Sequence, residues 1–117
     1  MKEILGALDY LSSLSPKIIH YDLKPQNIMF CKGKVKILDF GLSRQIDNEH
    51  SKIALSNQGI GTYWYLPPES FNDKNPEISE KVDIWSAGVI FYEMLFGKKP
   101  FGHNKSQNTI YQQGTIL

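Results

Sequence analysis

The chain has 117 residues, of which 41% are hydrophobic and 21% are charged, and its formal net charge is +1. This size and composition are typical of one soluble globular domain or part of one, which excludes a disordered tract and a fibrous repeat. The near-neutral charge gives no reason to expect direct nucleic-acid or membrane binding. The single cysteine, Cys31, excludes an intrachain disulfide and a cysteine-based zinc cluster.

The first predicted element is an amphipathic helix near the start of the chain. Its apolar stripe consists of Ile4, Leu5, Leu8 and Leu11. Leucine and isoleucine at this spacing place one apolar face toward a core. The dipeptide Ser15-Pro16 is a helix stop, so we expect the helix to end before it.

A β-hairpin is predicted next. Apolar runs at 28–30 and 35–38 are separated by Lys32-Gly33, which is a plausible turn. The hairpin would bring residues on either side of it close together.

The remaining segments are a loop and two helices. Residues 42–62 show little periodicity and are predicted to form a long loop. The stretch 83–96 is apolar on nearly every face and is followed by Gly97, so a buried helix spanning about 80–97 is expected. A weaker surface helix is predicted at about 104–113.

The residues whose side chains could take part in catalysis or bind a metal lie at the two ends of the predicted hairpin. Asp22, Lys24 and Asn27 precede it, and Asp39 follows it. Amide and carboxylate oxygens are the hard ligands that Mg²⁺ prefers, with phosphate oxygens completing the octahedron. A carboxylate pair for glycoside hydrolysis is the rival interpretation, but Lys24 would lower the pKa of a general acid beside it. Phosphoryl transfer is therefore favoured.

Four ordered motifs resemble those of eukaryotic protein kinases. They are HYDLKPQN (20–27), similar to the catalytic loop, DFG (39–41), PPE (67–69) in place of APE, and DIWSAG (83–88). The resemblance covers essentially the whole chain. It implies a protein-kinase-like α+β fold: a mainly α-helical C-lobe fragment, with a short β-hairpin at the catalytic and DFG loops. The stretches GTYWYLPPE (61–69) and KPFGHNKSQ (99–107) resemble the Tousled-like serine/threonine kinases more narrowly.

The resemblance assigns the reaction chemistry to four residues. Asp22 would orient the acceptor hydroxyl of a protein substrate, and Lys24 would contact the γ-phosphate of ATP. Asn27 and Asp39 would hold two Mg²⁺ ions. ATP and Mg²⁺ are therefore the expected cofactors.

Five further residues would bind ATP or the substrate. Met29 and Leu38 would form the lower wall of the adenine pocket, and Thr62 would bond to the side chains of Asp22 and Lys24. Tyr63 and Trp64 lie where kinases position the substrate chain, although they could equally be core aromatics.

A structural role is implied for five others. His20 would pack behind Phe40, and Gly41 would let the backbone pivot so that Asp39 can face in or out. Asp83 would bond the catalytic-loop backbone, or act only as a helix cap. Glu69 would lack its usual arginine partner, at a cost of several kcal/mol if it is buried.

The chain contains no glycine-rich phosphate loop and no strand lysine of the VAIK type. We therefore expect a fragment that lacks the N-lobe and the last C-lobe helices, and that has little or no activity alone. A pseudokinase or docking module, and a truncated product without autonomous function, are the alternatives. Intact Asp22, Lys24, Asn27 and Asp39 argue against the pseudokinase.

The resemblance also implies partners and a location. Tousled-like kinases act in the nucleus on histone chaperones and self-associate through coiled coils that this sequence does not contain. Ser51 and Ser56 are candidate phosphorylation sites. Most kinases carry an arginine where this chain has Tyr21, and a tyrosine cannot form a charge-assisted pair with a phosphate. Phosphorylation of the loop is therefore predicted not to act through residue 21.

Overall fold

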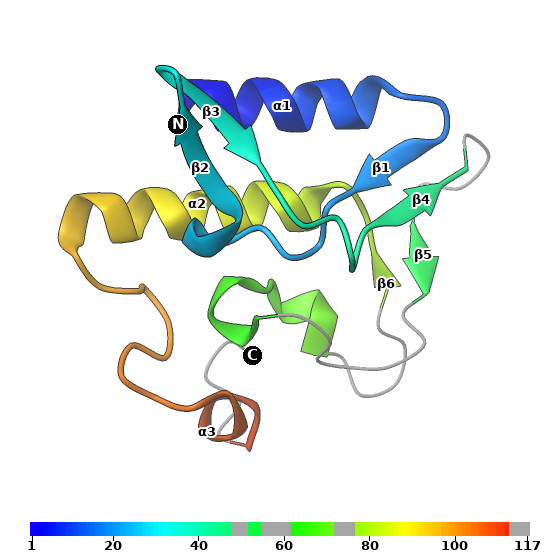
Figure 1. Ribbon diagram of the computed structural model, residues 1–117. Helices are drawn as coiled ribbons and strands as arrows, with labels where there is room; N and C mark the ends of the chain where they lie inside the picture. Colours follow the sequence, from blue (N-terminus) through cyan, green and yellow to red (C-terminus); the bar gives the residue numbers. More distant parts are fainter. Residues whose placement is uncertain (48–51, 55–61, 72–76, 113–117) are drawn as a thin grey trace.

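The computed structural model describes residues 1–47, 52–54, 62–71 and 77–112 (Figure 1). In these ranges the α-helices are α1 (Lys2–Ser13), α2 (Lys81–Phe96) and α3 (Gln107–Gln112). The strands are β1 (Lys17–Ile19), β2 (Ile28–Cys31), β3 (Lys34–Ile37), β4 (Arg44–Ile46), β5 (Ile53–Ala54) and β6 (Glu77–Ile78). Short 3-10 helices span Pro25–Asn27, Tyr63–Tyr65 and Pro68–Phe71.

Helix α1 forms as predicted and ends at Ser13, before the Ser15-Pro16 stop. Ile4 and Leu8 are buried, but Leu5 is 44% exposed, so its assignment to the buried face was wrong. Residues four apart lie almost directly above one another on a helix, whereas the adjacent residue is rotated by about 100°. Ile4 and Leu8 therefore define the face, and Leu5 lies beyond its edge.

The predicted hairpin is present as β2 and β3, which pair antiparallel from Ile28↔Ile37 to Cys31↔Lys34. Lys32 and Gly33 both have positive φ, at 50° and 75°, as expected for the tight turn of a two-residue hairpin. Leu38 lies just beyond β3, and its N–H donates to the Asn27 carbonyl at 2.8 Å. This bond closes the base of the hairpin and brings the two polar ends together.

The prediction of an unbroken loop over 42–62 was wrong. Strand β4 pairs with β1, and β5 pairs with β6, each antiparallel. These strands have only three and two residues, which is too short for a readable alternation. Their partners are also distant in the sequence, so local patterns carry no sign of them.

Helix α2 runs from Lys81 to Phe96 and ends at Gly97, which has φ of 67° and donates its N–H to the Glu93 carbonyl. The prediction of a helix buried on nearly every face was wrong. The exposed apolar side chains are Ile84, Phe91, Met94, Leu95 and Phe96. Within the described residues, α1 and the 63–65 turn contact the helix. The side chains that remain exposed show that these contacts cover only part of the helix.

Two apolar clusters form the core. The first core cluster consists of Ile4, Leu8, Leu23, Tyr65, Ala87, Val89 and Ile90. The second core cluster consists of Ile19, Tyr21, Ile46, Leu66, Phe71, Ile78 and Val82. Tyr21 and Leu23 therefore lie in different clusters, so Asp22 between them is fixed on both sides.

Helix α3 begins at Gln107 and not near residue 104 as predicted, and its Ile110 is buried. No helix in the described part of the chain is long and apolar enough to cross a membrane. The fold is thus a small mixed α/β arrangement in which α1 and α2 run across the molecule and the β2–β3 hairpin crosses them (Figure 1).

Candidate active site

The loop between β1 and β2 is held through its backbone by one buried carboxylate. Asp83, in the first turn of α2, accepts the N–H of His20 at 2.7 Å and the N–H of Tyr21 at 2.9 Å. Burial raises the pKa of Asp83, and the two N–H groups oppose this rise because they stabilise the ionised form. The predicted contact with the loop backbone is therefore present, and the role of Asp83 is not limited to capping the helix.

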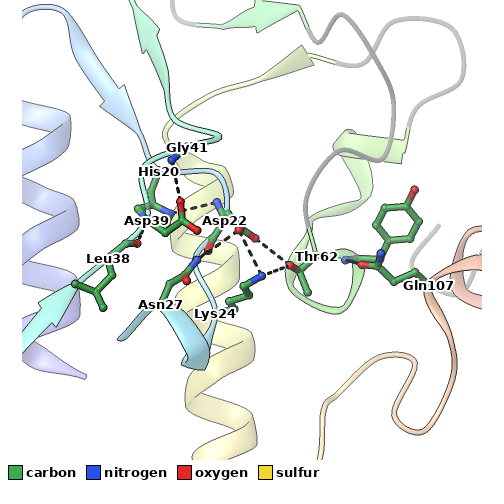
Figure 2. Close-up of polar contacts among 10 residues, drawn as sticks. His20, Asp22, Lys24, Asn27, Leu38, Asp39, Gly41, Thr62 and Gln107 are labelled. Carbon is green, nitrogen blue, oxygen red and sulfur yellow. Dashed lines mark hydrogen bonds and ion pairs between the residues drawn. The ribbon is translucent and has the colours of Figure 1, made fainter. Parts of the chain in front are cut away.

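His20 is a structural residue in this geometry. Its Nε2 lies 2.8 Å from the Leu38 carbonyl, while its Nδ1 accepts the Asp22 N–H at 3.2 Å (Figure 2). These two bonds assign the proton to Nε2. The ring also meets Phe40 edge-on, with centroids 4.7 Å apart, as the resemblance implies. His20 thus links Asp22 to the segment that carries Asp39.

Asp22, Lys24 and Thr62 form a triangle of polar contacts (Figure 2). The Thr62 hydroxyl donates to Asp22 Oδ1 at 2.9 Å and accepts from Lys24 Nζ at 3.0 Å. Lys24 Nζ lies 3.4 Å from Asp22 Oδ2. The expected bonds of Thr62 are therefore present, and they hold both chemical groups in one orientation.

Asn27 and Asp39 supply the oxygen ligands predicted for a metal. The Asn27 side-chain nitrogen donates to the Asp22 carbonyl at 2.8 Å, which leaves its amide oxygen for a cation. Asp39 is exposed and lies two residues beyond β3, beside the Leu38 bond to Asn27. No group of three or more His, Cys, Asp or Glu among the described residues could hold a metal alone. Two hard oxygen donors suit Mg²⁺ when phosphate and water provide the other ligands.

The DFG turn adopts a strained backbone at Asp39 rather than at Gly41. Asp39 has φ of 56°, and its Oδ1 accepts the Gly41 N–H at 3.1 Å. A Cβ at Gly41 would lie 3.1 Å from the same oxygen. In this conformation a larger residue at position 41 would require the Asp39 side chain to move slightly, and the pivot role expected for Gly41 stays a prediction.

The predicted floor of the adenine pocket lies on and beside the hairpin. Met29 is 52% exposed and Leu38 is 38% exposed. Apolar side chains of this size on a surface can cover one face of a flat ligand.

Hydrogen bonds and core packing hold the Thr62–Tyr65 segment in place. Tyr63 N–H donates to Gln107 Oε1 at 2.9 Å, and Trp64 Nε1 donates to the Gly102 carbonyl at 2.9 Å. Tyr65 is buried in the first core cluster, and Tyr63 and Trp64 are only partly buried. Tyr65 is thus a core residue, whereas Tyr63 and Trp64 can still meet a substrate.

Glu69 is exposed, so the predicted cost of an unpaired buried acid does not arise. Water solvates its charge instead. Ser51 and Ser56, the candidate phosphorylation sites, lie outside the described residues.

Sequence reasoning missed three residues that support the site. Ser86 donates to the Tyr65 carbonyl at 2.7 Å, Glu93 accepts the Tyr65 hydroxyl at 2.7 Å, and Gln107 accepts the Tyr63 N–H. Ser86 and Glu93 follow Asp83 at helical spacing, which places them near one face of α2. A polar residue repeated along an otherwise apolar helix was the signal that could have identified the first two. Gln107 had no such signal.

The fold and the site define a class of protein. Residues 1–116 match the family model described as protein kinase domain. The chain therefore belongs to the protein kinase family.

More narrowly, the chain is similar to Tousled-like enzymes. It is 54% identical to serine/threonine-protein kinase tousled-like 2 of Homo sapiens, over 98% of this chain and 16% of that protein. It is 56% identical to serine/threonine-protein kinase TOUSLED of Arabidopsis thaliana, over 98% of this chain and 17% of that protein. Identity to tousled-like 1 of Caenorhabditis elegans is 48%, over 98% of this chain and 13% of that protein. The chain thus spans less than one fifth of the length of these relatives.

Proposed function

We propose that this chain is the large-lobe segment of a serine/threonine protein kinase, which transfers the γ-phosphate of ATP to a protein hydroxyl with the help of Mg²⁺. The triangle of Asp22, Lys24 and Thr62 carries this proposal. It holds a carboxylate and a cation together at a loop whose backbone is itself fixed by Asp83.

The triangle explains how the carboxylate would act. Thr62 and Lys24 restrain Asp22 from two directions, so its oxygens are preorganised for a substrate hydroxyl. The transition state of phosphoryl transfer is loose, so holding the hydroxyl in line matters more than early removal of its proton. Lys24 would stabilise the negative charge on the transferring phosphate.

The nucleotide would lie between the hairpin and this triangle. Met29 and Leu38 offer an apolar floor for adenine, and Asn27 and Asp39 would hold the metal. The amide oxygen of Asn27 and the carboxylate of Asp39 would hold Mg²⁺, whose positive charge would stabilise the negative charge that develops on the phosphate. Asp39 would need to keep one oxygen free of Gly41, which its second carboxylate oxygen provides.

A phosphotransfer assay on the longer protein that carries this chain tests the proposal. With ATP, Mg²⁺ and casein, Asp22→Asn is expected to lower kcat by about 10²- to 10⁴-fold. Asp39→Ala is expected to abolish activity and Mg²⁺-dependent ATP binding. Full activity in both variants would refute the assignment. The isolated chain is expected to show little activity, and Asp39-dependent phosphorylation of casein by it would contradict that part.

The substrates and location follow the family resemblance. We infer a protein substrate with a Ser or Thr acceptor, a histone chaperone by that resemblance alone, and a nuclear location with self-association through other regions. Imaging and crosslinking of the longer protein test these points. A cytoplasmic monomer would contradict them.

Regulation is proposed to be independent of a charge pair at residue 21. Tyr21 is buried and neutral, so it offers no cation to a phosphorylated loop. Tyr21→Arg in the longer protein is expected to make activity depend on loop phosphorylation. Loss of wild-type activity in Ser56→Ala would count against the proposal.

A further inference from the structure

Tyr21 occupies an unusual place in the loop. Its backbone has φ of 70°, a region that non-glycine residues seldom adopt, yet its side chain is only 2% exposed. The Asp83 carboxylate accepts its N–H and offsets the backbone strain. The left-handed backbone therefore accompanies a side chain directed into the protein.

That side chain joins the loop to segments far away in the sequence. The second core cluster around it contains residues from β1, β4, β6 and α2, together with Leu66 and Phe71. Leu66 lies two residues before the 3-10 turn Pro68–Phe71, which carries Ser70, and Phe71 is the last residue of that turn. The ring of Tyr21 is thus packed beside the end of the segment that begins at Thr62.

The hydroxyls of Tyr21 and Ser70 are both buried, and neither has a hydrogen-bond partner among the described residues. Ser70 immediately precedes Phe71, which packs with Tyr21 in the second core cluster. Burial raises the pKa of Tyr21, and the neighbouring Ser70 hydroxyl partly opposes that rise.

Two buried hydroxyls without other partners can meet their hydrogen-bonding requirement by bonding to each other. Each is both a donor and an acceptor, so they can satisfy each other after a small rotation. A phenylalanine at 21 and an alanine at 70 would fill similar space without any polar group to satisfy. The presence of two buried hydroxyls in this region therefore points to a use for the pair.

We propose that Tyr21 is a positioning residue, whose hydroxyl pairs with that of Ser70 and thereby couples the catalytic loop to the turn at Pro68–Phe71. Asp22 is the next residue after Tyr21, and Thr62 begins the segment that ends in this turn. The pair would set how Asp22 and Thr62 meet without needing a phosphate. The kinetic consequence rests on the kinase function proposed above.

A double-mutant cycle in the longer protein tests the pair. Tyr21→Phe and Ser70→Ala are each expected to lower kcat roughly three- to tenfold, because the lost hydroxyl leaves its partner buried and unpaired. KM for ATP is expected to stay unchanged, since neither residue lies among the proposed ATP ligands. The kcat of the double variant is expected to be no lower than that of the single variant with the lower kcat. Tyr10→Phe, at a 64% exposed tyrosine on α1, is the control and should match wild type.

Effects of the two substitutions that multiply would overturn the proposal, as would wild-type kcat in Tyr21→Phe. Melting temperatures of all four proteins, measured in parallel, separate the pair from the proposed function. If wild type transfers no phosphate, the proposed function fails, and non-additive melting shifts still reveal the pair. Non-additive melting with unchanged kcat would refute the positioning role. Ser70→Ala removes a single oxygen atom, so it still measures the loss of one hydroxyl of the pair if Tyr21→Phe folds poorly.

Discussion

The loop between β1 and β2 and the Thr62–Phe71 segment both rest on α2, but α2 holds them in different ways. The loop is held through its backbone, because Asp83 accepts the N–H groups of His20 and Tyr21. The second segment is held at Tyr65, whose carbonyl accepts from Ser86 and whose hydroxyl donates to Glu93. One attachment uses a buried charge, and the other divides the work between a hydroxyl and a partly exposed carboxylate.

The two attachments differ in how much substitution they tolerate in the segment that they hold. A carboxylate that binds backbone N–H groups fixes the loop whatever side chains it carries, so the loop can present Asp22 and Lys24 outward. The second segment depends on the identity of Tyr65, since Glu93 binds its side chain. Asp83, Ser86 and Glu93 lie three and seven residues apart, so one stripe of α2 aligns both pieces of the site.

Removing the buried carboxylate should have the largest effect on this comparison. Asp83→Ala leaves the N–H groups of His20 and Tyr21 buried without an acceptor, at a cost of about 3 kcal/mol in the free energy of unfolding. Urea denaturation of the chain, followed by tryptophan fluorescence, measures the loss. Asp9→Ala, at an exposed aspartate on α1, is the matched control and should change stability by less than about 0.5 kcal/mol. Equal behaviour of the two variants would show that the loop does not depend on Asp83.

Removing the hydroxyl that holds Tyr65 should cost less. Ser86 donates to the buried Tyr65 carbonyl at 2.7 Å and lies 3.1 Å from the Val82 carbonyl. Ser86→Ala leaves the Tyr65 carbonyl without this donor, so we expect a loss of about 1 to 2 kcal/mol. Hydrogen exchange should show increased opening of residues 62–66 and little change at residues 18–23. Equal opening of both segments would break the distinction between the two attachments.

The sequence predicted the parts of this site that follow one another closely. The spacing of Asp22, Lys24 and Asn27, the Lys32-Gly33 turn and the Gly97 stop depend on local chemistry, and the structure contains each of these features. The resemblance added contacts across long separations, such as those of Thr62 with Asp22 and of Asp83 with the loop.

The missed features share a physical cause. Strand β4 is only three residues long and pairs with β1, so no local periodicity could reveal it. The exposed side of α2 was missed because hydropathy reports what a helix tolerates and not which neighbours cover it. Tyr21 and the turn that carries Ser70 come together only when the chain folds, so no local pattern in the sequence indicates the proposed hydroxyl pair.

The Tyr65 hydroxyl offers a milder way to weaken the second attachment. Tyr65 donates to Glu93 Oε2 at 2.7 Å, and Lys99 Nζ lies 3.4 Å from Glu93 Oε1. Tyr65→Phe keeps the ring in the first core cluster and leaves Glu93 with Lys99, so we expect a loss of about 1 kcal/mol. Tyr10→Phe controls for the loss of an exposed hydroxyl and should be neutral. A loss above about 3 kcal/mol in Tyr65→Phe would mean that Glu93 is not solvated or held by Lys99.

The smallest expected effect is a pH dependence that belongs to the first attachment alone. Burial raises the pKa of Asp83 above its unfolded value of about 4, so the folded chain binds this proton more tightly than the unfolded chain. The corresponding stabilisation is complete below pH of about 4 and is lost as pH rises through the folded pKa. Asp83→Asn removes this titration. In urea denaturation at increasing pH above about 4, the stability of wild type should therefore fall relative to Asp83→Asn. If the stability of wild type instead rises relative to that of Asp83→Asn as the pH increases, the two N–H bonds outweigh burial and lower the pKa of Asp83.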